Sequence, residues 1–153
     1  TNSALGAGPR LVDMGIEPYL VLDALVGVLS QRLVRRVCTG CGELVPASGA
    51  ELAWLESEGP LDVAHGRGCA ACDGSGFRGR TSLIELFLPD AVSIEALRSG
   101  ASHAEVERLA RAGGFRSMNE SGRHLVQNGI TTMEEVQRVS RAHFLSAEER
   151  AGL

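Results

Sequence analysis

Four cysteines carry the strongest chemical signal in the sequence. They form two C-x-x-C pairs, Cys38 with Cys41 and Cys69 with Cys72, separated by residues 42–68. In a C-x-x-C turn both thiolates point toward one ion, and two such turns supply the four sulfur ligands of a tetrahedral structural zinc site. The spacing therefore predicts one Zn²⁺ bound by all four cysteines, with two disulfides or free thiols as the alternatives.

The segment that carries these cysteines is small for a self-supporting fold. It covers residues 38–79, close to the size of about 40 residues below which a domain needs a metal, disulfides or a partner. Residues 1–12 show no basic start followed by a long apolar run, so no secretory signal favours the disulfides. Zinc is the favoured element that holds this lobe together.

Composition places the chain among folded proteins that bury an ordinary core. Of its 153 residues, 44% are hydrophobic and 22% are charged, which is too apolar for a disordered protein. The longest apolar stretch, 19–29, contains Asp23 and is shorter than the roughly 20 residues of a membrane span. A net charge of −4 and 4% aromatic residues argue against nucleic acid as the main partner. We expect no transmembrane segment and no nucleic-acid site.

Three other features lie in or beside the cysteine-rich segment. His65 precedes Cys69 by four residues and is an alternative ligand, although four cysteines already complete a tetrahedron. Trp54, in a short helix predicted over 51–58, is interpreted as the apolar plug of a small lobe. Residues 74–79 spell G-x-G-x-x-G, but a strand-like run follows instead of a helix, so we expect no dinucleotide site there.

Two helices are predicted before the cysteines. Pro9 lies in the first turn of one, which Gly15 ends, and a longer helix is predicted over 18–36 from apolar residues at helical spacing. Three arginines lie in its last turns: Arg32, Arg35 and Arg36. They are interpreted as cations at the negative end of the helix dipole, with docking of an acidic partner or a neighbouring subunit as the alternative.

A strand and several helices are predicted after the cysteines. The strand covers 81–88, bounded by glycines and Pro89. Capping residues and glycine stops predict helices from Asp90 or Ser93 to Arg98, from Ser102 to Gly113, over 117–127 and from Thr132 onward, with a last short turn over 146–150. Three histidines in this part are interpreted as surface residues: His103, His124 and His143.

Several motifs stand in the order found in one protein family. Besides both C-x-x-C pairs they are T-N-S-A at 1–4, R-L at 10–11, D-M-G-I-E-P-Y at 13–19, Q-R-L-V-R-R at 31–36, G-F-R-G-R at 76–80 and G-I-T-T-M-E-E-V at 129–136. Residues 1–140 resemble the C-terminal part of the type II secretion ATPases, a region that those proteins share with the type IV pilus assembly ATPases. Two departures are the absence of proline after Cys38 and Ser82-Leu83 in place of the common Gly-Ile.

The resemblance implies a fold and a division of the chain. The fold is α/β, mainly helical here, as the C-terminal piece of a RecA-like P-loop ATPase core with an inserted tetracysteine lobe. Residues 1–36 are the last segment of that core, and 37–80 are the zinc lobe. Residues 81–145 are a strand with a C-terminal helical subdomain, and 146–153 are a tail.

The resemblance also implies cofactors, partners and a location. Family members with this lobe are hexameric ATPases on the cytoplasmic side of the bacterial inner membrane, where they contact the inner-membrane secretion platform and its cytoplasmic adaptor. ATP and Mg²⁺ belong to the full-length protein, because G-x-x-x-x-G-K-[ST] has no match here and we expect no hydrolysis by this chain alone. Arg80 is placed by analogy near the nucleotide edge, and a surface arginine paired with an acid such as Glu85 is the alternative.

Other functions remain as alternatives. The runs at 34–36 and 129–136 favour type II secretion over type IV pilus assembly. A stand-alone zinc-ribbon interaction module would bind metal in the same way. The second cysteine pair also resembles the C-x-x-C-x-G-x-G knuckle of DnaJ-type chaperones, although the first pair does not repeat that pattern.

Overall fold

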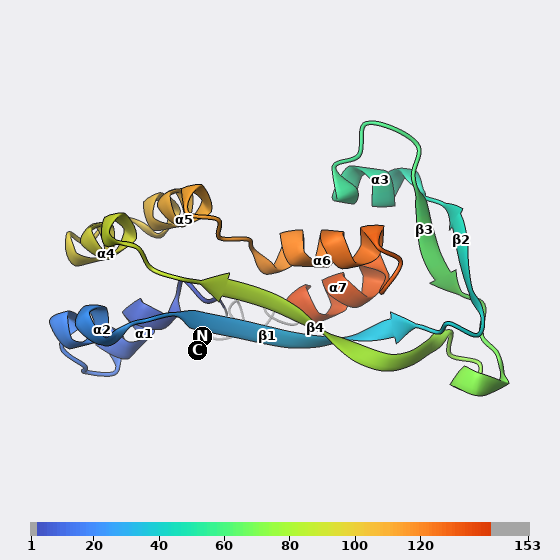
Figure 1. Cartoon of the computed structure of the whole chain (residues 1–153), viewed down its shortest axis with the longest axis horizontal. Coiled ribbons are helices and arrows are strands. Elements are labelled where there is room, and N and C mark those ends of the chain that lie inside the picture. Colours follow the sequence, from blue (N-terminus) through green and yellow to red (C-terminus); the bar gives the residue numbers. More distant parts are fainter. Residues whose placement is uncertain (1–2, 142–153) are drawn as a thin grey trace, which may run out of the picture. The chain divides into compact units, whose positions relative to one another are not determined.

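The computed structural model describes residues 3–141, which form two compact units (Figure 1). Unit 1 comprises the described residues up to 31 together with 84–117, and unit 2 comprises 32–83 together with the described residues from 118 onward. Strand β1 (Val28–Val37) pairs with β4 (Phe77–Phe87), and both strands have residues in each unit. The fold of the described residues is a mixture of helices and two-stranded sheets.

Unit 1 is built around an aromatic pair. Its helices are α1 (Ala7–Asp13), α2 (Pro18–Ala24), α4 (Ala91–Arg98) and α5 (His103–Ala112). Phe87 and Phe115 meet edge to face with ring centroids 6.3 Å apart, which is a favourable aromatic geometry. The rest of the core consists of small and aliphatic side chains: Ala4, Leu5, Val106 and Ala110.

Unit 2 combines several elements with an aliphatic core. These are the unit 2 parts of β1 and β4, the antiparallel pair β2 (Gly42–Pro46) and β3 (Asp62–Gly66), α3 (Gly49–Leu55), the short 3₁₀ turn η1 (Ala70–Cys72), α6 (Met118–Gln127) and α7 (Met133–Arg141). The buried side chains are Val34, Leu55, Val63, Leu83, Val126 and Val136. Figure 1 shows α6 beside α7, where Gly122 lies directly against Val136. Leu55 and Val63 of the cysteine-rich segment are part of this core.

The long helix predicted over 18–36 is wrong. Helix α2 begins at Pro18 as expected but ends at Ala24, Leu25 has extended backbone, and β1 begins at Val28. Pairing with β4 supplies backbone hydrogen bonds that the spacing of apolar residues does not reveal. The β-branched valines of this stretch also favour a strand.

The dipole interpretation of the arginines is therefore wrong as well. Arg32, Arg35 and Arg36 lie in β1, not at the end of a helix. Arg35 instead forms an ion pair with Glu135 of α7, with 2.6 Å between Nη2 and Oε1. This contact links residues 100 positions apart in the sequence.

Most of the other predicted elements are confirmed. Helix α1 is followed by Gly15 with a positive φ of 90°, Asp90 caps α4, and α5 ends at Gly113. Strand β4 begins four residues before the predicted 81–88, and α3 ends three residues before the predicted end at 58. The helices α6 and α7 match the stretches predicted for them.

Several smaller predictions concern single residues or the end of the chain. His103 and His124 are exposed, as predicted. His143 and the turn over 146–150 lie outside the described residues. No helix within 3–141 combines the length and the apolar character that crossing a membrane requires.

Candidate metal centre

The four cysteines come from two turns that follow strands. Cys38 directly follows β1 and Cys41 directly precedes β2, whereas Cys69 lies after β3 and Cys72 ends the turn η1. The antiparallel pairing of β2 with β3 places Gly42 opposite Gly66, which brings the two turns to the same end of that pair. The two C-x-x-C turns are therefore neighbours in space.

The sulfur atoms form a cluster of the size that a zinc ion requires. All four Sγ atoms lie within 4.8 Å of one another, and all four cysteines are free thiols. The distances are 4.0 Å between Cys38 and Cys69, 3.8 Å between Cys41 and Cys72, and 3.7 Å between Cys69 and Cys72. With Zn–S bonds of about 2.3 Å, tetrahedral geometry puts sulfurs about 3.8 Å apart. The donor set fits a tetrahedral metal ion.

Backbone amides of the second turn are directed at one sulfur. The amide nitrogens of Cys69 and Gly76 donate to Sγ of Cys72 at 3.2 and 3.3 Å. The Cys69 amide has the larger effect, and with that of Gly76 it outweighs burial and lowers the pKa of the Cys72 thiol to about 6. Such amide donors to a ligand sulfur are typical of the surroundings of a metal site.

The Cys41 thiol has the opposite tendency. Burial raises its pKa to about 12 despite a hydrogen bond from the backbone of Gly68. A divalent cation among the sulfurs would bring both thiols to the thiolate form, because metal ligation requires deprotonated sulfur.

Glycine is required where the second turn packs against β3. A Cβ on Gly66 would overlap the backbone of Gly76, and a Cβ on Gly76 would in turn meet the carbonyl of Gly66. Gly76 also has a positive φ of 75°, which residues with a side chain rarely adopt. The absence of side chains at both positions allows the two backbones to approach this closely beside Cys72.

The other residues singled out in the sequence lie apart from the sulfur cluster. His65 binds the buried Glu51 of α3, with 3.1 Å between Nε2 and Oε1, and Glu51 is also the partner of Ser48 in the capping box of that helix. Burial acts to raise the pKa of Glu51, but hydrogen bonds from Ser48 and His65 lower it. Trp54 packs against the core of unit 2, as expected for an apolar plug.

The glycine-rich run and Arg80 lie on the way from η1 into β4. Gly74, Gly76 and Gly79 have positive φ angles, and the run leads into strand β4 instead of a helix. The expectation that it is no dinucleotide fingerprint is thus supported by the element that follows. Arg80 is exposed on β4, and its link to a nucleotide stays a prediction.

Sequence reasoning missed a buried glutamate in unit 2 that is paired with two half-exposed arginines. Glu135 is only 3% exposed and binds two arginines, Arg35 of β1 and Arg138 of its own helix. Burial would raise the pKa of Glu135, but hydrogen bonds from Arg138 and Arg35 lower it to about 2. The only sequence signal was the Thr-x-x-Glu pattern at the start of α7, which predicts a cap and not an interior ion pair.

Comparison with known proteins decides the family. The family described as "Type II/IV secretion system protein" matches residues 1–138. The chain belongs to this family. The fold and the cysteine cluster described above are therefore those of a type II/IV secretion system protein.

Individual relatives come from both branches of the family. The chain is 45% identical over 143 residues to the type II secretion system protein E of Pseudomonas aeruginosa, covering 92% of this chain and 28% of the relative. It is 41% identical over 143 residues to the type II secretion system ATPase E of Vibrio cholerae, with 92% and 28% covered. It is also 41% identical over 140 residues to the type IV pilus assembly ATPase PilB of Thermus thermophilus, with 89% and 16% covered. The chain thus spans less than a third of the length of these relatives.

Proposed function

We propose that this chain is part of an ATPase that powers type II protein secretion, and that its four cysteines bind one structural Zn²⁺. The observation that carries the first part is the 41% identity to a protein named type II secretion system ATPase E. The second part is supported by four sulfurs that lie within 4.8 Å of one another.

The zinc ion would have a structural role. Cys38, Cys41, Cys69 and Cys72 occupy all four positions of a tetrahedron, so no position stays open for a water molecule or substrate. When bound, the ion supplies a crosslink between the two turns. The residues around it, such as Gly76 with its amide donor to Cys72, orient the sulfurs and do no catalytic work.

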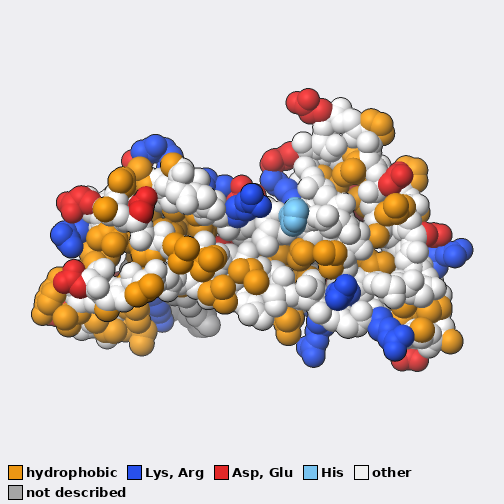
Figure 2. Space-filling view, viewed as in Figure 1, with side chains coloured by type: hydrophobic (Ala, Val, Ile, Leu, Met, Phe, Trp, Pro, Cys, Tyr) orange, Lys and Arg blue, Asp and Glu red, His pale blue; other side chains and the backbone are white. Residues whose placement is uncertain are grey.

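The apolar surface of unit 1 supports contact with further protein in the longer chain. Met14, Tyr19 and Val26 are 69%, 60% and 87% exposed. Figure 2 shows hydrophobic side chains gathered over the part of unit 1 that contains α1 and α2. Large exposed apolar areas mark surfaces that contact other protein. In our proposal the rest of the ATPase core covers this face.

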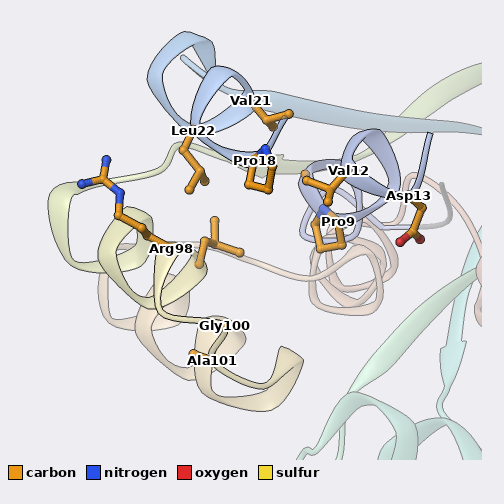
Figure 3. Close-up of a pocket in the computed structure, with 11 residues that line it drawn as sticks. Pro9, Val12, Asp13, Pro18, Val21, Leu22, Arg98, Gly100 and Ala101 are labelled. Carbon is orange, nitrogen blue, oxygen red and sulfur yellow. The ribbon is translucent and has the colours of Figure 1, made fainter. Parts of the chain in front are cut away.

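Unit 1 also contains a cavity between its helices. It has a volume of about 400 Å³ and is lined by α1, α2 and the end of α4. In Figure 3 Val12, Pro18 and Leu22 surround it, with apolar carbon atoms toward the space. Such an opening suits apolar side chains from the remainder of the core better than a charged ligand.

The remaining features follow from the proposed family role. The longer protein would bind ATP and Mg²⁺, assemble as a hexamer in the cytoplasm at the bacterial inner membrane, and contact the secretion platform and its adaptor. Residues 1–36 would close the RecA-like core, 37–80 would form the zinc lobe, and 81–145 would form the C-terminal subdomain with the tail 146–153. Arg80 would lie at the nucleotide edge.

The experiment that tests the proposal is deletion of the gene in its own host. We expect extracellular enzymes to accumulate inside the cells, and complementation with the wild-type gene to restore their release. Complementation with a Cys72→Ser gene should fail. A Thr39→Ser gene should succeed, because Thr39 lies between Cys38 and Cys41 but is exposed and is not a ligand. Unchanged release of proteins from the deletion strain would contradict the secretion assignment.

Type IV pilus assembly is the second candidate function. It is supported by the 41% identity to the PilB ATPase of Thermus thermophilus. The same deletion strain separates the two candidates, because loss of surface pili with normal protein release would favour pilus assembly. Loss of protein release with normal pili would favour secretion.

A further inference from the structure

The end of strand β1 contacts the candidate metal centre directly. The amide of Cys38 donates to the carbonyl of Gly76 at 2.9 Å, and the amide of Gly76 donates to Sγ of Cys72 at 3.3 Å. The guanidinium carbon of Arg35 lies 4.3 Å from the ring centroid of Phe77, the residue after Gly76. A cation at this distance from an aromatic ring is attracted to its face. Arg35 therefore contacts the residue that directly follows the second cysteine turn, residues 69–76.

The same end of β1 also holds the C-terminal helices. The amide of Val37 donates to the carbonyl of Ile130 at 2.9 Å, and Oγ1 of Thr131 donates to the carbonyl of Arg35 at 2.8 Å. Both the amide and the guanidinium of Arg35 then donate to Glu135, at 3.1 and 2.6 Å. Four hydrogen bonds thus connect residues 35–37 of β1 with residues 130–135.

Arg35 and Arg138 both bind Glu135, but they come from different elements. Arg138 binds Glu135 from within α7, three residues away along the same helix. Arg35 binds the same carboxylate from another element while its guanidinium lies on Phe77. A buried carboxylate that loses one of its charged partners is strongly destabilised. Of these two arginines, Arg35 is the one whose side chain joins α7 to the segment after Cys72, beside the backbone hydrogen bonds of β1.

We infer that the cysteine cluster and α7 form one cooperative element, and that Arg35 is the positioning residue that couples them. Loss of metal frees the turn at 72–76, Phe77 then no longer fixes the guanidinium of Arg35, and the contact with Glu135 weakens. The state of the metal centre is in this way transmitted to the helix at the end of the described chain. This inference rests on the proposed zinc site.

The experiment is amide hydrogen exchange of the complete protein, measured by mass spectrometry with zinc bound and after its removal by a chelator. We expect faster exchange at residues 38–41 and 69–76 and, at the same chelator concentration, at 133–141. The increase at 133–141 should be at least about tenfold, because exchange rates report local opening. Helix α5 of unit 1 provides an internal reference that should not change.

Three variants locate the coupling. Arg35→Met keeps the apolar stem but removes the charge, so it should retain one zinc, show fast exchange at 133–141 already with zinc bound, and respond little further to the chelator. Arg138→Met removes the other partner of Glu135 and should keep the response to the chelator. Arg36→Met, at the exposed neighbouring position of β1, should behave like the wild type.

The outcomes separate this inference from the zinc assignment. Zinc-containing protein whose exchange rises at the cysteines but not at 133–141 would overturn the coupling and leave the metal centre intact. A full response of 133–141 in Arg35→Met would also overturn it. Protein that contains no zinc, with exchange unaffected by the chelator, would instead refute the proposed metal centre.

Discussion

Unit 1 and unit 2 each bury a glutamate near the end of a strand or helix, but different groups stabilise it. In unit 1 Glu85 accepts hydrogen bonds from the hydroxyl of Ser3 and the amide of Ala4, at 2.8 and 2.7 Å. In unit 2 Glu135 binds two guanidinium groups. Unit 1 also has an aromatic core, whereas unit 2 contains all four cysteines. Unit 2 should therefore respond to removal of the metal, and unit 1 mainly to changes in packing.

Removing one cysteine tests this contrast with the largest expected effect. In Cys72→Ser the metal loses a ligand, and structural zinc contributes on the order of 10 kcal/mol in small zinc-binding peptides. We expect the lobe of residues 37–80 to unfold, measured by the fluorescence of Trp54, the single tryptophan of the chain. Unit 1 should keep protected amides in α5. Protected amides throughout unit 2 in this variant would contradict the proposal that unit 2 depends on the metal.

Truncation of an aromatic core residue should have the reverse pattern. Phe115→Ala removes half of the aromatic pair of unit 1 and should cost about 3–5 kcal/mol. The zinc content and the Trp54 signal should stay as in the wild type, since both belong to unit 2. Val92→Ala, at an exposed position of α4, is the control and should cost little. A loss of zinc from Phe115→Ala would show that the two units are not independent in this respect.

Replacement of the buried glutamate in unit 2 should give a smaller, pH-dependent effect. Because the pKa of Glu135 is lowered to about 2, Glu135→Gln should cost about 3 kcal/mol at pH 7. The folded pKa lies below the unfolded one, so this stabilisation is complete well above pH 4.5 and is lost as the pH falls toward 2. Urea unfolding of both proteins at pH 7, 5 and 3 measures the difference. A difference that grows on acidification would contradict the assigned ion pairs.

Two glycine substitutions should give the smallest effects, and the two should differ in size. A Cβ at Gly122 would overlap Val136, so Gly122→Ala should destabilise unit 2 by about 1–3 kcal/mol. A Cβ at Gly8 of α1 meets no atom within 4 Å outside its chain neighbours, but Pro9 follows and disfavours helical backbone at a residue with a Cβ, so Gly8→Ala should change the stability of unit 1 by less than about 0.5 kcal/mol. Thermal unfolding of each unit provides the comparison. Equal effects from both substitutions would mean that the contact between α6 and α7 is looser than described.

The cysteine cluster could be predicted because its signal is local. Each pair fixes its own turn through a spacing of three, so the sequence already places Cys38 beside Cys41 and Cys69 beside Cys72. Capped helices were predictable for the same reason, as at Asp90, where cap and helix are neighbours in the chain. Local chemistry of this kind needs no knowledge of the tertiary structure.

The missed features depend on partners that are distant in the sequence. Residues 28–37 have apolar side chains at helical spacing, and only pairing with β4 makes them a strand. Glu135 looks like an ordinary residue of a helix start, and its burial depends on Arg35, 100 residues earlier. In both cases the deciding interaction is between segments that the sequence does not place together.

The most direct test of the central claim is X-ray absorption at the zinc edge of the purified protein, together with its zinc content. We predict one zinc per chain, with four sulfur neighbours at about 2.3 Å and no nitrogen or oxygen neighbour. His65→Ala should leave the spectrum unchanged, since that side chain binds Glu51. Folded protein without zinc, or a spectrum with a nitrogen neighbour in place of one sulfur, would contradict the account.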